Sequence, residues 1–213
     1  MKVISTICRL VVITLLATSS AQALSILDVS DALNVGDPTQ FGRLSRNGIP
    51  QDWTGGEPFP GVINTTLPYY YHTYLVNVGI TPFIQIDFDS VSLYTFVSAY
   101  DTSYAPESAG SPNFGFDTNW LGDAGQSGNF FGVDPLFFQV VIPQDHNLLI
   151  VVNNTAAGFG VGDPFHLIVE GFIDSQFTDP PGTTPVPEPT TMLLLGSGLI
   201  GLAGYGRKMF FKK

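Results

Sequence analysis

The sequence predicts an all-β fold, a single antiparallel β-sandwich of the jelly-roll type, flanked by an N-terminal signal peptide and a C-terminal transmembrane helix. Three observations lead to this fold class. Apolar and polar residues alternate with period two through the central chain, no stretch sustains a 3.6-residue apolar period, and the 213 residues include 23 glycines and 16 prolines. Short strands separated by frequent turns are typical of two antiparallel sheets packed face to face.

Residues 1–23 are predicted to be a signal peptide. The positive charge of Lys2 precedes a short apolar run at residues 10–16, and small residues follow up to Ala21 and Ala23. The run is too short to cross a bilayer stably, and signal peptidase accepts small side chains at its cleavage site. We expect cleavage after Ala23, with a permanent N-terminal anchor as the alternative. Cleavage removes Cys8, the only cysteine of the chain, so the mature protein has no disulfide bond.

Two segments are expected to form the mature domain, a wrapping segment at residues 24–68 and a β-sandwich core at residues 69–178. Residues 26–33 are compatible with a short helix, and residues 36–68 carry few strand signals. In the core, the period-two alternation predicts strands near residues 74–78, 83–89, 94–100, 136–142, 148–152 and 165–172. The segment at 148–152 is apolar throughout, which favours a strand that is covered on both faces.

The charge balance of the mature domain excludes one class of partner. Residues 24–185 contain 17 of the 18 acidic residues of the chain but only two basic ones, Arg43 and Arg46, which gives a formal charge of −15. A field of this sign repels nucleic acid and anionic lipid head groups. It favours solubility, cations or neutral partners such as glycans, and the sequence therefore predicts no nucleic-acid binding.

The sequence lacks the common catalytic motifs. It contains no Gly-x-Ser-x-Gly elbow, no His-Glu-x-x-His pair, no P-loop and no dinucleotide-binding fingerprint. The three histidines, His72, His146 and His166, fall on predicted strands or in a polar turn. His166 and Glu170 share a strand face but lie about 13 Å apart along it, too far to pair. We expect a non-catalytic domain, and a secreted hydrolase whose site assembles from distant residues is the alternative.

The connection at residues 101–134 is much longer than the usual connection of about 4–6 residues. It is also acidic, and its aspartates are Asp101, Asp117, Asp123 and Asp134. Carboxylates are the hard oxygen ligands that Ca²⁺ prefers, although no EF-hand spacing is present. Calcium binding is therefore one hypothesis for this loop. A solvated acidic loop that contains one more β-hairpin is the favoured alternative.

The same loop carries aromatic residues, among them Tyr104 and Trp120. Sugar-binding sites use such rings beside Asn and Asp, because the ring stacks on a pyranose while the polar groups bind its hydroxyls. A glycan site at Trp120 and Tyr104 is therefore a second hypothesis. The alternative is that these rings pack the loop onto the sandwich.

The C-terminal end predicts insertion into a membrane. A proline-rich linker at residues 179–189 ends in Val186, Pro187, Glu188 and Pro189. Residues 190–206 are uncharged, and as a helix they span roughly 25 Å, near the lower limit for a bilayer. The tail at residues 207–213 contains the basic residues Arg207, Lys208, Lys212 and Lys213. The positive-inside rule holds this tail in the cytoplasm, so we expect the domain on the periplasmic side of the inner membrane.

The Val-Pro-Glu-Pro motif, the short glycine-bearing apolar helix and the basic tail, in this order, resemble the PEP-CTERM sorting signal. The resemblance covers residues 186–213. It implies recognition and cleavage by an exosortase-type membrane transpeptidase in a Gram-negative bacterium that produces exopolysaccharide. It also implies a final place at the cell surface or in the biofilm matrix, where exopolysaccharide is the glycan available for binding.

Residues 69–172 are similar to sandwich modules of the pre-peptidase C-terminal type, in their strand order and in the turn at residues 143–147. That resemblance implies an accessory or adhesion-type domain without catalytic residues. We therefore predict an exported, non-catalytic surface or matrix protein, with signal peptidase and exosortase as its processing partners. An exopolysaccharide-binding module and a secreted hydrolase are the alternatives.

Overall fold

The computed structural model describes residues 23–106, 113–129 and 135–173. All of them belong to one compact unit, residues 22–182. The predicted signal peptide up to residue 22, the linker at 179–189, the helix at 190–206 and the basic tail lie outside the described residues. Within the described ranges, no helix is long and apolar enough to cross a membrane.

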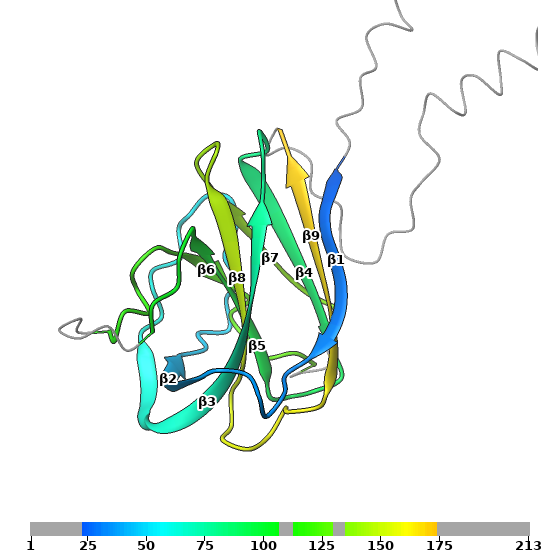
Figure 1. The fold of residues 1–213 in the computed structure, drawn as a ribbon. Helices are drawn as coiled ribbons and strands as arrows, with labels where there is room; N and C mark the ends of the chain where they lie inside the picture. The colour runs from blue at the N-terminus through cyan, green and yellow to red at the C-terminus, as the bar shows by residue number, and fades with distance from the viewer. Residues whose placement is uncertain (1–22, 107–112, 130–134, 174–213) are drawn as a thin grey trace, which may run out of the picture. The chain divides into compact units, whose positions relative to one another are not determined.

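The described chain folds into two antiparallel sheets that face each other (Figure 1). One sheet has the order β1 (Leu24–Ala32), β9 (Pro164–Phe172), β4 (Phe83–Ser90) and β7 (Leu136–Val141). The other has the order β2 (Thr39–Leu44), β3 (Val62–Asn77), β8 (Asn147–Asn154), β5 (Thr95–Asp101) and β6 (Trp120–Asp123). Every named pair of neighbours is antiparallel. The prediction of an all-β antiparallel sandwich is confirmed for these residues.

The strand pairing is nested. Within the described residues β5 pairs with β6, β4 with β7, β3 with β8, and β1 with β9. A long antiparallel hairpin that is rolled up produces this pattern, which is the pairing of a jelly roll. β2 is an addition at the edge beside β3. The first half of β3 pairs with β2 and not with β8, and it forms the curved part of β3 visible in Figure 1.

Apolar side chains at alternate positions of the strands fill the space between the two sheets. On β4 the alternate residues Ile84, Ile86 and Phe88 are fully buried, and Leu167 and Val169 of β9 lie opposite Phe88 and Ile86. Each buried side chain of this size stabilises the fold by about 1.5–3 kcal/mol relative to an exposed one. The apolar segment at 148–152 is part of β8, which lies at the centre of its sheet, as its composition predicts.

The prediction for residues 24–68 needs correction. Residues 26–33, which are compatible with a short helix, instead lie almost wholly in β1, which pairs with β9 along its length. The stretch with few strand signals contains β2 and the start of β3. The reason is that pairing with a partner strand makes these segments strands. The partner of β1 is β9, about 140 residues away in the sequence, and a local residue pattern does not reveal such a partner.

The segment from Asn47 to Trp53 bridges one edge of each sheet. β6 and β7 are edge strands, and Gln51 contacts both: its N–H donates to Asp123 O at 3.0 Å, and its carbonyl accepts from Gln139 N at 2.8 Å. Gly125 follows β6 with a φ of 69°, and a Cβ there would lie 2.5 Å from the backbone of Ile49. These hydrogen bonds occupy edge groups of Asp123 and Gln139 that would otherwise be open to pairing with another chain.

Candidate functional site

The four aspartates of the predicted calcium site occupy different surroundings. The carboxylate of Asp101 lies 2.8 Å from His146 Nδ1, and Asp117 accepts a hydrogen bond from the amide of Asn113 at 2.8 Å. Asp123 lies opposite Ser98, three residues along β5 from Asp101, which corresponds to roughly 10 Å. Asp134 lies outside the described residues. In the described part of the chain no three acidic, histidine or cysteine side chains gather as ligands for a metal ion.

Asp123 is the most deeply buried of the three aspartates that the structure describes here. It is 3% exposed, and one oxygen accepts a hydrogen bond from the N–H of Gly125 at 2.8 Å. Burial raises the pKa of Asp123 to about 7, and the Gly125 N–H opposes that rise. A carboxyl group in this position is a buried structural group at the sheet edge, held beside the segment that contains Gln51.

Tyr104 and Trp120 belong to a small second core on the outer face of the five-stranded sheet. This core consists of Leu44, Phe96 and Phe116, with Phe59, Val62, Tyr104 and Trp120 packed against it. The ring of Tyr104 lies 4.7 Å from that of Tyr100, and its hydroxyl donates to Gln40. Trp120 meets Phe59 edge to face at 5.6 Å. Their rings therefore pack the loop onto the sandwich, the alternative that the sequence left open.

A different aromatic pair is exposed. Tyr94, in the turn before β5, and Phe159, in the loop after β8, are 38% and 58% exposed, and their ring centroids lie 5.1 Å apart. Sequence reasoning missed both, because Tyr94 is counted in a predicted strand and Phe159 stands in a glycine-rich turn. Only their meeting in space distinguishes them from other surface aromatics.

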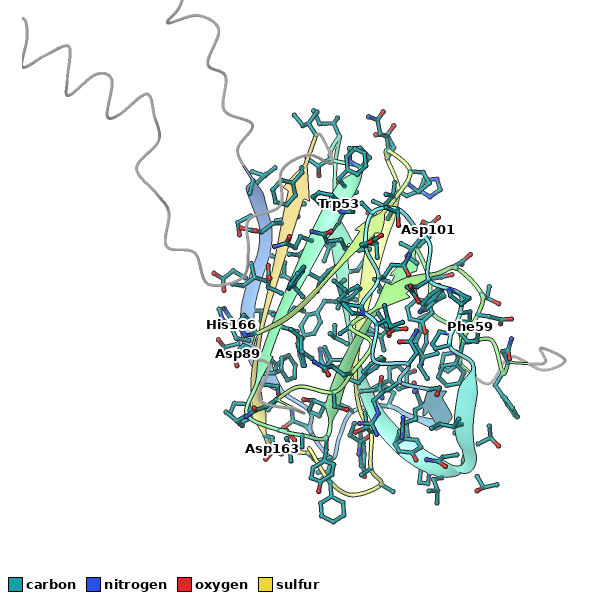
Figure 2. The ribbon with its side chains drawn as sticks, turned by 180° about the vertical axis from the view of Figure 1, so that it is seen from behind. Trp53, Phe59, Asp89, Asp101, Asp163 and His166 are labelled. Atoms are coloured by element: carbon teal, nitrogen blue, oxygen red, sulfur yellow. The ribbon has the colours of Figure 1, made fainter. Side chains whose placement is uncertain are left out.

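Each histidine contacts an aspartate. His166 on β9 lies 2.7 Å from Asp28 on β1, and His146 lies 2.8 Å from Asp101. His72 on β3 lies 3.2 Å from Asp37, in the link between β1 and β2. Figure 2 shows His166 beside Asp89, its cross-strand neighbour on β4. The three pairs occupy separate places, and each joins two elements of the fold.

Beside the His72–Asp37 pair, Asp31 on β1 accepts a hydrogen bond from the hydroxyl of Tyr74 at 2.8 Å. Burial pushes the pKa of Asp31 upward, but the Tyr74 hydroxyl, the N–H of Ala32 and the nearby His72 outweigh it, so the pKa lies below its ordinary value. This contact holds β1 to β3, across the gap between the two sheets.

Comparison with known proteins bears on the C-terminal end. The family model of the PEP-CTERM protein-sorting motif matches residues 185–208. The chain carries a PEP-CTERM sorting motif. It marks an exported protein that is sorted through the membrane and processed by exosortase, a membrane enzyme. No curated protein matches the chain.

The PEP-CTERM match contains most of the sorting residues that the sequence predicts. Val186, Pro187, Glu188 and Pro189 lie within it, as do Arg207 and Lys208. Lys212 and Lys213 follow beyond its end. The resemblance of residues 69–172 to pre-peptidase C-terminal modules has no support from these comparisons and stays a prediction.

Proposed function

We propose that this PEP-CTERM protein is a non-catalytic β-sandwich that is delivered to the cell surface or the biofilm matrix. The observation that carries the proposal is the sorting motif at residues 185–208 on a chain whose sandwich ends before it, with β9 at Phe172. Exosortase therefore acts on a segment that contributes no strand to the described fold.

The position of β1 supports removal of the predicted leader. β1 begins at Leu24, directly after the predicted cleavage site at Ala23. Signal peptidase and exosortase would thus trim the chain on either side of the nine named strands without removing any of them. Before the second cleavage, the helix at 190–206 and the basic tail hold the domain on the periplasmic side of the inner membrane.

The surroundings of the histidines support a role without catalysis. His166, His146 and His72 each lie against an aspartate in a contact that joins two strands or a strand and a link. A structural role, holding two elements of the fold together, explains all three histidine–aspartate contacts. The proposed role is therefore structural: the protein presents a compact acidic domain outside the cell.

Replacement of the motif tests the proposal in the producing cell. Glu188→Ala combined with Pro187→Ala should leave the protein in the inner membrane with its basic tail attached, whereas the unchanged chain loses that tail and reaches the surface or medium. Cell fractionation and intact-mass measurement distinguish the two forms. Pro180→Ala, in the linker before the matched residues, is the control and should be processed normally. Wild-type protein found in the cytoplasm would refute the proposal.

A further inference from the structure

We propose that Tyr94 and Phe159 form a binding surface for a neutral polysaccharide, in which the two rings stack on sugar residues. The inference deepens the proposed function by naming a ligand class for the exported domain. The first observation is exposure. Phe159 is 58% exposed and Tyr94 38%, and Val91 and Leu93 beside Tyr94 are 64% and 43% exposed. Exposed apolar side chains that contact each other, as the rings of Tyr94 and Phe159 do, mark a binding site more often than an isolated one does.

The loop that carries Phe159 is held by a buried amide. Asn154 is fully buried, and its side-chain amide donates to the carbonyls of Ala156 at 2.9 Å and Phe159 at 3.0 Å. Its side-chain oxygen accepts from Tyr70 N at 2.7 Å, which ties the loop to β3. Three hydrogen bonds from one buried side chain therefore fix the position of the Phe159 backbone.

The turn that carries Tyr94 is held against that loop. The carbonyl of Tyr94 accepts from Thr155 N at 2.7 Å. Gly160 has a φ of 77°, and a Cβ there would lie 3.0 Å from the same carbonyl, so the two segments are in close contact. The N–H of Tyr94 donates to the hydroxyl of Ser92 at 3.2 Å. Rings on a rigid frame lose little entropy on binding, which favours affinity.

The ring surroundings favour a sugar. The rings are tilted by 41° to each other, and Phe159 follows Ala156, Ala157 and Gly158, whose small side chains leave room beside it. A pyranose presents a face of C–H groups to a ring, and the Tyr94 hydroxyl supplies a polar group at the edge. A stable protein partner needs about 800 Å² of surface on each side, far more than these few side chains supply.

The negative charge of the domain favours a neutral polysaccharide over an anionic one. Its two cations are engaged in hydrogen bonds within the fold. Arg43 is 6% exposed and donates to Leu44 O at 2.9 Å, and the partly buried Arg46 donates to the Ser127 hydroxyl at 2.6 Å. Residues 24–185 carry a formal charge of −15. An anionic polysaccharide would be repelled by this field, whereas a neutral one would not.

Affinity electrophoresis of the purified full-length protein in detergent tests the inference, with dextran, laminarin or galactomannan in the gel and alginate as the anionic comparison. At least one neutral polysaccharide should retard the protein, and alginate should not. Phe159→Ala should weaken the retardation at least about 10-fold. Phe159→Leu keeps apolar volume but loses the ring, and it should lose the retardation too, whereas Phe159→Trp should keep it.

Phe137→Ala is the matched control, because Phe137 is 39% exposed on β7 in the other sheet, and it should bind like the wild type. Retardation by none of the three neutral polysaccharides would overturn the inference. So would a Phe159→Leu protein that binds as well as the wild type, since an apolar contact would then suffice. The assay uses purified protein and does not depend on sorting, so its failure leaves the proposed delivery to the surface intact.

Discussion

The second core around Phe116 and the pair of Tyr94 and Phe159 use the same kind of residue in opposite ways. Phe116 is fully buried in the cluster with Leu44 and Phe96, and its ring lies 5.9 Å from that of Tyr104. Phe159 meets one ring and is 58% exposed. The difference shows that an aromatic residue in a loop has no function by itself. What decides is whether the rest of the chain covers the ring.

Truncation of the two phenylalanines should give the largest difference between these regions. Phe116→Ala removes a fully buried ring and should lower the free energy of unfolding by about 3–5 kcal/mol, because it leaves a cavity. Phe159→Ala removes an exposed ring and should change it by no more than about 0.5 kcal/mol. Urea denaturation measures both. Equal losses in the two variants would mean that Phe159 also serves the core.

Asp123, the last residue of β6, should give the next largest effect. Its pKa in the native state is about 7, above the value of about 3.9 in an unfolded chain. The native state therefore binds more protons between these values, and the free energy of unfolding should fall as the pH rises from about 4 to 7. Asp123→Asn removes this titration and should be the more stable protein at pH 8, by on the order of 3 kcal/mol.

Thermal or urea unfolding between pH 4 and pH 8 measures this dependence. The asparagine side chain keeps an oxygen that can accept the hydrogen bond from the Gly125 N–H, which is 2.8 Å long in the wild type. Burial also raises the pKa of Asp87, but that group is present in both proteins and cancels in the difference. Parallel pH profiles for the wild type and Asp123→Asn would show that Asp123 does not titrate in this range.

Calcium should give the smallest effect. The described aspartates of the loop do not gather into a ligand set, since Asp101 contacts His146, Asp117 contacts Asn113 and Asp123 is buried. Millimolar Ca²⁺ added after EGTA should therefore raise the midpoint of thermal unfolding by no more than about 1 °C beyond the rise with Mg²⁺. A rise of several degrees specific to Ca²⁺ would instead support the calcium hypothesis and point to a site that includes Asp134.

Some features of this protein follow from local patterns. Alternation in β4 and β9 predicts the strands and their buried faces, because side chains on a strand point to opposite sides regardless of its partners. The wholly apolar run in β8 likewise predicts a strand covered on both faces. The sorting motif is a linear signal read by a membrane enzyme, so its residues carry the information without a fold. The charge of −15 is likewise a property of composition alone.

Other features were decided only by the tertiary structure. β1 and β2 are strands because β9 and β3 pair with them, and no local period reveals such partners. Tyr104 and Trp120 pack against the second core, whereas Tyr94 and Phe159 are exposed, although all four are aromatic residues in or beside loops. The physical reason is that burial is a property of the whole packed chain: a ring loses contact with water only when segments distant in sequence fold over it.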